Sequence, residues 1–591
     1  MLNIYRNTLL FVAAALLAGG CASSRNAGRA QVSAAPSPYA VMPDASGHVT
    51  VDVDLEIPDH YFSRRSRLVI LPAVMKDSTL VAEMAPVAVD APIYAKKLHR
   101  KEVLEDYDDT HEGQKRTLKR LSDTVLIHYR DSAYLGESAD GSRIVAFVTS
   151  DGCGSCRALD TLHLGGISDP GNLLSPDSLR LVTLEPVFVV RQKVREGKGE
   201  AELQFRINRS DINLSLGRNR EEMSRMFEAL QPVISDTLAT LNMVSIYGMA
   251  SADGSLAFNT RLAEARAGSA RDWLLSELDG LTYAQRKCFR IGSRPEGWAP
   301  VLKAMTLAGD KDSVLVKDIL EKYAGSNDDV QERYIRRLPC WPVIRDNYLQ
   351  KDRKVEYVYT YSIRSFTTDE EMLEMFSTRP DAFNEEEFLR VSTLKEEPVE
   401  KMEVYRTLLG YYPQSQVAVN NLSVMMYERE GAVSAWDLIY SLDEYSHEAL
   451  NTKAVITAAA GQVPHAISLL EDCTDLSEAR YNLGLLKAIG KDYEGAYPLL
   501  QPFADVNAAI VAVCLGKYDE AGQILSSLDD VSPLAEYVRA FVAAWNGDAD
   551  TFFTHLEAAV SDNSLRNRAA SEAMFDIFRD DVRFDVIMEK R

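Results

Sequence analysis

The sequence of 591 residues has no apolar run of 18 residues, no excess of basic residues and no low-complexity stretch. Because a membrane-spanning helix needs about 20 mostly apolar residues, no segment predicts one. Asp and Glu number 87 against 65 Lys and Arg, which gives a net charge of −22. Such an acidic chain lacks the field that attracts nucleic-acid backbones, so we expect no nucleic-acid partner. The 32 Gly and 22 Pro are near average usage, which excludes a collagen-like architecture.

Sequence signatures of catalysis and of metal binding are also missing. The nine His are scattered without the spacing of metal ligands, and no Ser-His-Asp set, phosphate-binding loop or defined pair of carboxylates is recognisable. We therefore expect a protein that is not an enzyme and that has no metal and no cofactor. The hydrophobic fraction of 46% is enough for packed cores, and the length predicts three to five domains.

The N-terminal segment is typical of an export signal. Residues 1–20 carry one charge, Arg6, followed by an apolar run at 9–18 that is too short to span a bilayer. The sequence Leu-Ala-Gly-Gly-Cys at 17–21 resembles a bacterial lipobox, with one extra Gly. The resemblance implies a lipoprotein in which the thiol of Cys21 receives diacylglycerol and Cys21 becomes the first mature residue. The alternative is an ordinary signal peptide that is cut elsewhere.

A lipid anchor of this kind would hold the mature chain at a membrane. Each buried methylene contributes about 0.8 kcal/mol, so several palmitate-like chains give stable anchoring. Residues 22–25 contain no acidic side chain. By analogy with lipoprotein sorting, this indicates the outer membrane, with the protein facing the periplasm. Residues 21–45 are polar and contain Pro, which favours a lipidated tether.

Behind the tether, the pattern predicts a multidomain fold. We expect a mostly-β domain at 46–195, an α+β domain at 196–365, a solvated, Glu-rich helical linker at 366–399 and an all-α repeat array at 400–591. Within the first domain, strands are expected from alternating or apolar runs at 49–55, 67–74, 125–129, 143–148 and 186–190. Residues 96–122 are dense in both signs of charge and favour a solvated helix or loop.

A pair of cysteines in the first domain allows two interpretations. Cys153 and Cys156 form a CxxC sequence after an expected strand, which superficially resembles the redox motif of thioredoxin-like proteins. The β-α unit that should precede such a motif is missing. A structural disulfide in an exported domain is the simpler interpretation. Redox chemistry stays open as the one lead towards an enzyme.

The central domain alternates strands and helices in a βαβαβ order. Strands are expected at 202–208, 244–249 and 355–363, and helices at 221–241 and 258–278. In the second helix, apolar side chains recur at intervals of three and four residues, as on one buried face. An insertion at about 293–342 contains a further helix-like run.

The second strand and helix carry the most specific motif of the chain. Residues 248–254 read Gly-Met-Ala-Ser-Ala-Asp-Gly, and Asn259, Leu262, Arg266 and Ala267 follow. This pattern resembles the OmpA C-terminal family, and more narrowly the version common in Bacteroides-type bacteria. In that version, a β-rich domain of unknown function precedes the module and helical repeats follow it. The resemblance covers nearly the whole chain, but only this middle part carries a functional motif.

The resemblance implies that the central domain binds the diaminopimelate of the peptidoglycan stem peptide. Asn259 and Arg266 lie two helical turns apart and share a face, and an Arg offers two parallel donors to a carboxylate. Ser251 stands where the family has Asp, and a hydroxyl adds no charge for an ammonium group. Asp253 could replace that carboxylate, or the domain has another partner. The alternative for Arg266 is a surface ion pair with Glu264 or Glu221.

From about residue 400 the chain repeats. The small or apolar residue of each second helix recurs at intervals of 31, 30, 25 and 31 residues: Ala435, Ala466, Ala496, Ala521 and Phe552. The spacing is close to the 34 residues of tetratricopeptide repeats, and the segment resembles a degenerate array of about five helix pairs. Such arrays bind extended peptides or proteins along a groove, although a purely structural role is the alternative.

The modules together predict a cell-envelope adaptor. It is anchored in the outer membrane by lipid, binds peptidoglycan through the central domain and binds a protein partner through the repeats. The alternative function is an assembly or anchoring factor for a surface structure such as a fimbria, with a central domain that no longer binds peptidoglycan.

Overall fold

The computed structural model describes most of the chain. The described residues are 31–35, 40–44, 46–59, 61–76, 78–105, 107, 109, 111, 113–135, 141–151, 157–206, 208–250, 255–294, 297–349 and 354–590. They belong to two compact units, one formed by Met1–Leu184 with Ser423–Arg591 and the other by Glu185–Leu422. No described helix is long and apolar enough to cross a membrane.

Several sequence-based expectations concern residues outside these ranges. The expected signal peptide is among them, together with the following single residues: Cys21, Cys153, Cys156, Ser251 and Asp253.

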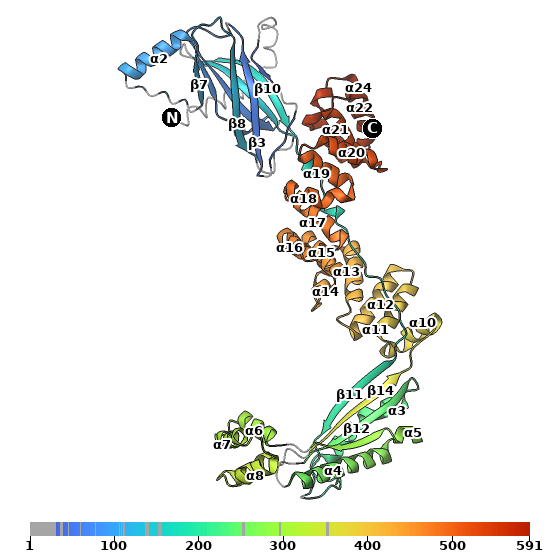
Figure 1. Ribbon diagram of the computed structural model, residues 1–591. Helices are drawn as coiled ribbons and strands as arrows, with labels where there is room; N and C mark the ends of the chain where they lie inside the picture. Colours follow the sequence, from blue (N-terminus) through green and yellow to red (C-terminus); the bar gives the residue numbers. More distant parts are fainter. Residues whose placement is uncertain are drawn as a thin grey trace. The chain divides into compact units, whose positions relative to one another are not determined.

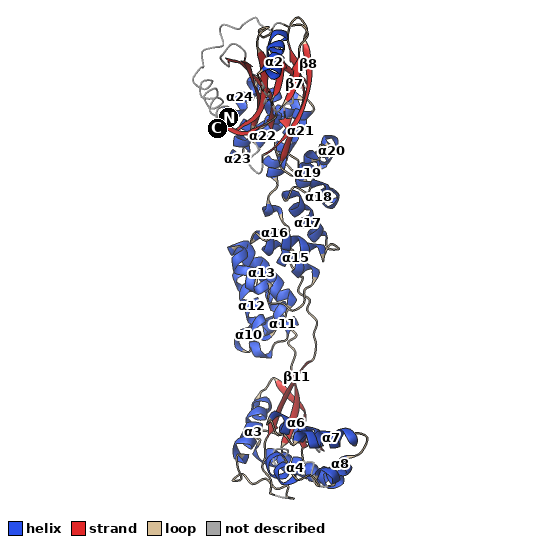
Figure 2. Ribbon diagram, turned by 90° about the vertical axis from the view of Figure 1, so that its left-hand side faces the viewer, coloured by secondary structure: helices blue, strands red, loops and turns tan. Residues whose placement is uncertain are grey.

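The N-terminal part of the first unit is rich in β-strands, as the sequence predicts (Figure 2). One sheet has the order β1-β3-β8, and the other has the order β2-β10-β9-β4-β6-β7 with β5 paired to β4. The strands are β1 (Ser33–Ala35), β2 (Ala40–Val41), β3 (His48–Ile57), β4 (Arg67–Lys76), β5 (Thr79–Glu83), β6 (Val87–Asp90), β7 (Gln114–Thr117), β8 (Val125–Tyr134), β9 (Arg143–Asp151) and β10 (Arg157–Ile167). In β3, Val49, Val51 and Val53 are buried while the residues between them are exposed or half-buried, so one face covers a core.

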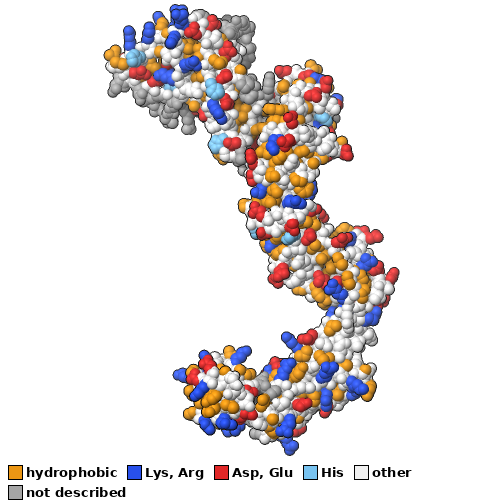
Figure 3. All heavy atoms as spheres, in the orientation of Figure 1, with side chains coloured by type: hydrophobic (Ala, Val, Ile, Leu, Met, Phe, Trp, Pro, Cys, Tyr) orange, Lys and Arg blue, Asp and Glu red, His pale blue; other side chains and the backbone are white. Residues whose placement is uncertain are grey.

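The charged stretch at 96–122 contains a helix and a strand. Helix α2 (Pro92–Leu104) buries only Leu98, which agrees with a solvated helix. Basic side chains gather over this part of the surface (Figure 3). The four residues of β7 are all exposed, and the strand pairs in parallel with β6. An edge strand of this kind has no apolar alternation, which is why its sequence predicts a loop.

The strand expected at 186–190 is absent, which corrects the end of the first domain. Residues 179–192 belong to no helix or strand, and the last strand of the β-rich part ends at Ile167. Val187, Val189 and Val190 remain 66%, 48% and 55% exposed. An apolar run forms a strand only where another strand pairs with it, and here none does.

The second unit contains a four-stranded sheet. The order is β11-β14-β12-β13, and β12 and β13 are parallel while the other pairs are antiparallel. The elements are β11 (Lys193–Ala201), α3 (Asn219–Ser235), β12 (Ala239–Gly248), α4 (Leu256–Glu277), α5 (Tyr283–Arg286), β13 (Phe289–Ser293) and β14 (Val355–Ile363). Apolar residues of α3 and α4 join those of β12 and β14 in one core.

The first strand of this sheet lies earlier than the sequence predicts. It was expected at 202–208, but β11 ends at Ala201. Its sequence is charged and contains Gly197 and Gly199, which argues against a strand. The reason for the glycines is tertiary, because a Cβ at Gly197 would lie 2.2 Å from the ring of Tyr359 on β14. The first helix also ends earlier than expected, at Ser235 instead of Leu241, because β12 begins at Ala239.

The insertion after β13 is a small helical layer with a core of its own. It comprises α6 (Trp298–Leu307), α7 (Ser313–Lys322), α8 (Asp328–Ile335), α9 (Trp341–Val343) and η4 (Ile344–Tyr348). Trp298, Met305 and Ile344 are almost fully buried in it.

The expected solvated linker at 366–399 is a packed structure, which is a further correction. It contains α10 (Asp369–Thr378), η5 (Pro380–Ala382) and α11 (Glu385–Leu394), and α12 (Pro398–Tyr411) follows. Phe383 and Phe388 are buried. The Nζ of Lys193 on β11 lies 2.9 Å from Oε2 of Glu387, with both side chains almost completely buried. The sequence predicts a solvated linker because it is acidic and has few aromatic residues. Most of those few are buried in the structure and pack the segment.

The C-terminal part of the chain is an all-helical repeat array, as the sequence predicts. Five helix pairs follow one another: α13 (Gln416–Glu430) and α14 (Ala432–Ile439), α15 (His447–Ala459) and α16 (Val463–Glu471), α17 (Ser477–Ile489) and α18 (Tyr493–Leu500), α19 (Val506–Cys514) and α20 (Tyr518–Ser527), and α21 (Pro533–Trp545) and α22 (Ala549–Ala559). The array closes with α23 (Asn563–Ser571), η7 (Ala573–Phe578) and α24 (Val582–Glu589). All five residues that define the repeat spacing are completely buried: Ala435, Ala466, Ala496, Ala521 and Phe552.

Candidate functional site

The motif of the central domain lies where β12 leads into α4. Strand and helix approach closely here, because a Cβ at Gly248 would lie 1.9 Å from the carbonyl oxygen of Ala263. Only a glycine leaves room for this packing. The side chain of Ser255 accepts a hydrogen bond from the backbone N–H of Phe258 and caps the helix. Ser255 therefore marks the start of α4, four residues after Ser251 and two after Asp253 in the sequence.

The two described site residues lie on the buried face of α4. Asn259 is 5% exposed and Arg266 is 2% exposed. Arg266 donates from Nη1 to the carbonyl oxygen of Met249 at 3.1 Å and from Nε to that of Arg209 at 3.4 Å. Its guanidinium also lies 4.7 Å from the ring centre of Phe205. Arg266 therefore ties the end of β12 to the segment after β11 and is a buried residue, unlike the surface residue of the alternative interpretation.

The insertion reaches the N-terminus of α4. The backbone N–H of Leu256, the first residue of the helix, donates to Oδ1 of Asp329 on α8 at 2.7 Å. The positive end of a helix favours an anion, and here a carboxylate of the same chain takes part of that position. The sequence does not indicate this internal occupant, because Asp329 is 73 residues away from Leu256.

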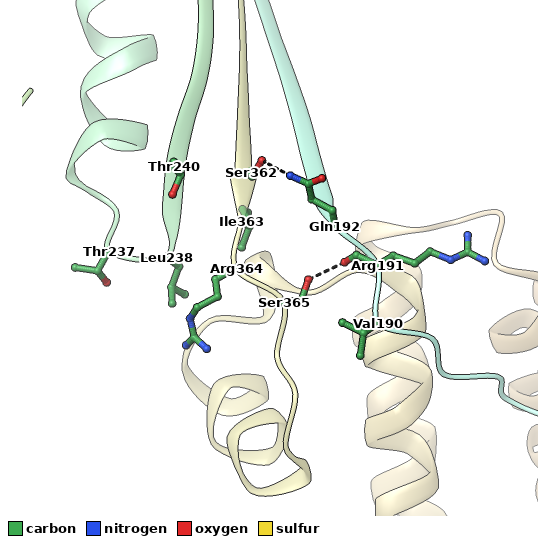
Figure 4. Close-up of a pocket in the computed structure, with 10 residues that line it drawn as sticks. All are labelled: Val190, Arg191, Gln192, Thr237, Leu238, Thr240, Ser362, Ile363, Arg364 and Ser365. Atoms are coloured by element: carbon green, nitrogen blue, oxygen red, sulfur yellow. Dashed lines mark hydrogen bonds between the residues drawn. The ribbon is translucent and has the colours of Figure 1, made fainter. Parts of the chain in front are cut away.

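A cavity of about 510 Å³ opens elsewhere in the second unit, at the start of β12 and the end of β14 and beside the residues that precede β11 (Figure 4). The Oγ of Ser365 donates to the carbonyl oxygen of Arg191 at 2.7 Å, and Nε2 of Gln192 donates to Oγ of Ser362 at 3.3 Å. Its lining residues are the following: Val190, Arg191, Gln192, Thr237, Leu238, Thr240, Ser362, Ile363, Arg364 and Ser365. This lining contains no His, Cys or carboxylate, so it offers neither a general base nor a thiol.

No group of three or more His, Cys, Asp or Glu is placed to hold a metal ion within the described ranges. Cys514 on α19 packs among the repeat helices, and burial raises the pKa of its thiol to about 12. A thiol with such a pKa is protonated near neutral pH and serves packing.

The repeat array contains a second candidate site that sequence reasoning missed. The segment 169–184, which follows β10, lies against the first helix of successive helix pairs. Asn451 on α15 and Asn482 on α17 form hydrogen bonds with the backbone of Arg180. A sequence signal for this site exists. Asn residues recur at 451, 482 and 507, with separations of 31 and 25 that follow the repeat spacing.

Comparisons with known proteins add little to these sites. No protein-family model matches the chain. No curated protein matches it. Among solved structures, the chain is similar to a tetratricopeptide repeat protein from Parabacteroides merdae ATCC 43184, with 10% identity and a TM-score of 0.25 over 46% of this chain and 95% of that chain.

A second similar structure is the APC/C hetero-tetramer Cut9–Hcn1, with 12% identity and a TM-score of 0.24 over 63% of this chain and 73% of that chain. At such TM-scores neither likeness carries an argument, and the repeat array rests on its own helix pairs.

Proposed function

We propose that the protein is a lipid-anchored adaptor of the cell envelope and not an enzyme. Its lipid on Cys21 would hold it in the outer membrane, facing the periplasm. Its OmpA-like central domain would bind the peptidoglycan stem peptide near Ser251, Asp253, Asn259 and Arg266. Its helical repeats would engage a protein, because arrays of this kind generally serve protein interaction.

One observation carries the peptidoglycan part of this proposal. Asn259 and Arg266 lie on the same buried face of α4, which begins at Leu256. The close approach at Gly248 gives a packing reason for the first residue of that motif. A planar guanidinium suits a carboxylate because it offers two parallel donors, and here a ligand that takes both would have to replace the bond to Met249 or the bond to Arg209.

The sharpest test adds the family carboxylate instead of removing a buried residue. We expect Ser251→Asp to strengthen binding to purified peptidoglycan sacculi by roughly 10- to 100-fold, because a charge-assisted hydrogen bond contributes about 1.5–3 kcal/mol. Ser276→Asp, at the exposed far end of α4, adds the same charge away from the site and is the matched control. The measurement is the fraction of protein that sediments with sacculi.

The outcome decides between binding and its loss. If wild type and Ser251→Asp both stay in the supernatant, the central domain does not bind peptidoglycan and this part of the proposal is wrong. If both serine variants sediment more than wild type, the added charge acts without using the site.

A second candidate function is an assembly or anchoring factor for a surface structure such as a fimbria. The contact of Asp329 with the N-terminus of α4 favours it, because a carboxylate of the chain already takes part of a helix end that could otherwise bind a ligand anion. Deleting the gene should then abolish the surface structure, while the purified protein shows no binding to sacculi. Intact surface structures in the deletion strain would contradict this function.

A further inference from the structure

An extended segment of the chain lies along the repeat array. After β10, the short turns η2 (Pro170–Leu173) and η3 (Pro176–Ser178) lead into residues without helix or strand (Figure 1). The segment 169–184 and the helices that it contacts belong to the same compact unit. We call this segment the internal strap.

Two buried amides hold the backbone of the internal strap at Arg180. Asn482 on α17 accepts a hydrogen bond from the N–H of Arg180 at 2.7 Å and donates to its carbonyl oxygen at 2.8 Å. Asn451 on α15 donates to the same carbonyl oxygen at 3.0 Å, and its Oδ1 accepts from Asn482 at 2.9 Å. Both asparagines are completely buried. Buried amides are costly unless they are hydrogen-bonded, and here the backbone of an extended chain supplies the partners.

The side chain of Arg180 enters an aromatic and acidic pocket. Its guanidinium lies 3.5 Å from the ring centre of Tyr481 and 5.0 Å from that of Phe503. Its Nη2 lies 3.2 Å from Oδ2 of Asp505. Asn507 donates to the hydroxyl of Tyr481 at 2.7 Å and so fixes the ring. A planar guanidinium stacks on aromatic faces better than an ammonium group, so the pocket favours arginine over lysine.

The beginning and the middle of the internal strap are also held. Lys491 lies 3.0 Å from Oδ2 of Asp169, and Arg568 donates to the carbonyl oxygen of Asp169 at 2.7 Å. Leu174 is 8% exposed and packs into the core of the array, while Leu179 packs against two of its clusters. The contacts thus combine backbone recognition, one selective side chain and apolar anchors, as in the binding of a peptide ligand.

The register of the asparagines shows that the site follows the repeats. Asn451 and Asn482 are 31 residues apart, and Asn507 follows after 25, like the spacing of the second helices. Asn451 and Asn482 bind the backbone of the strap from equivalent positions of successive first helices, and Asn507 binds the hydroxyl of the ring on which Arg180 stacks. A polar residue in the interior of a helix is unfavourable unless it has a hydrogen-bond partner, and here the partners of all three belong to one site.

We infer that the surface of α15, α17 and α19 around Asn451, Asn482 and Tyr481 is a binding site for an extended, arginine-bearing peptide. The chain fills this surface, which we call the repeat groove, with its own residues 169–184. The strap thereby fastens the β-rich part to the repeats. A partner that uses this groove has to present an arginine and displace a tethered ligand, whose effective concentration is on the order of millimolar. The inference bears on the protein partner of the proposed function and is independent of peptidoglycan binding.

The test uses the full mature chain and a fluorescein-labelled peptide with the sequence of residues 172–184. We expect the peptide to leave the wild-type chain unbound, because the groove is filled, and to bind Arg180→Ala, in which the internal anchor is lost. Adding Asn482→Ala to that variant should weaken binding at least tenfold, and so should Lys in place of Arg in the peptide. Fluorescence anisotropy gives the affinities. Equal binding to wild type and Arg180→Ala, or no binding to either, overturns the inference.

A second measurement needs no variant. Trypsin cleaves after exposed arginines, and the side chain of Arg191 is 68% exposed while that of Arg180 is 38% exposed and held in its pocket. We expect cleavage after Arg180 in the native wild-type chain to be at least tenfold slower than cleavage after Arg191. Equal rates at the two positions would show that the strap is not bound.

Discussion

The N-terminus of α4 and the repeat groove are both places that could take an external ligand, and both hold a group of the same chain. At α4 the occupant is one carboxylate, Asp329, with one hydrogen bond to the helix end. In the groove the occupant is an extended segment with backbone, side-chain and apolar contacts. The first contact is one that a stronger ligand displaces easily, whereas the second is a built-in ligand. The difference shows that the number and the burial of the contacts decide how firmly a group of the same chain occupies a binding site.

The largest expected effect lies in the groove. Asn482→Leu leaves the N–H of Arg180 and the buried Oδ1 of Asn451 without their hydrogen-bond partner, so we expect a loss of roughly 2–5 kcal/mol in the stability of the array. Hydrogen exchange of α17 and α19 measures it. Asn546→Leu, at an exposed helix end, is the matched control and should change stability by less than about 0.5 kcal/mol. Equal exchange in the two variants would mean that the strap contributes nothing.

The next effect tests the close packing of β12 against α4. A methyl group at Gly248 meets the carbonyl oxygen of Ala263, so Gly248→Ala should destabilise the central domain by roughly 1–3 kcal/mol. At Gly268 in the same helix, the nearest atom to a Cβ is Ile291 Cδ1 at 3.9 Å, and Gly268→Ala should stabilise by up to about 1 kcal/mol. Urea unfolding followed by circular dichroism compares the two. Opposite signs are the expected result, and destabilisation by both would contradict the close approach as its cause.

Acid should weaken the ion pair between Asp236 and Arg379 in the second unit, whereas the uncharged amides that hold Arg180 should not respond to it. The hydrogen bond from Arg379 holds the pKa of Asp236 below its usual value of 3.8. A carboxyl whose pKa is lower in the folded state stabilises the protein above its unfolded pKa, and this stability is lost as the pH falls towards the folded value. We expect Asp236→Asn to cost about 1 kcal/mol at pH 6 and less at pH 3.

Calorimetry at the two pH values checks this expectation for the second unit. The exposed Asp211→Asn is the control and should have no effect at either pH. A cost for Asp236→Asn that is the same at pH 6 and pH 3 would contradict an electrostatic origin.

The smallest expected effect tests how strongly Asp329 is bound at the N-terminus of α4. Asp329→Asn keeps the size of the side chain and removes its charge from the helix end, so we expect a loss of less than about 1 kcal/mol in stability. If peptidoglycan binds at this place, the same variant should bind sacculi more strongly. Asp318→Asn, on α7 of the same insertion, is the control. Unchanged sacculus binding in both variants would show that Asp329 does not compete with the ligand.

Local patterns explain which parts of the fold were predictable. The alternation of β3 and the three- and four-residue spacing of α4 come from one buried face each, and both are visible within a few residues. The recurrence of Ala435, Ala466 and Ala496 is likewise a property of the sequence. In contrast, β11 was misplaced because Tyr rings of β14 cover its glycines, and the linker at 366–399 was misjudged because a few phenylalanines bury it.

The candidate sites divide in the same way. The spacing of Asn259 and Arg266 predicts their common face, and the structure places both on the buried side of α4. That Arg266 donates to the backbone of Met249 and Arg209 was not predictable, since Arg209 is 57 residues away. Nor could the sequence indicate that Asp329 reaches Leu256.

By itself, the sequence determined the classes of its parts: strands with alternating side chains, an α+β motif with a close glycine, and a helical array with a regular repeat. These features depend on side chains that are neighbours within one or two turns, so the chain carries them locally. The tertiary structure alone decided what fills the repeat groove. Arg180 meets its partners across 271, 302 and 325 residues, and contacts at such separations follow from the packing of whole elements and not from any local pattern.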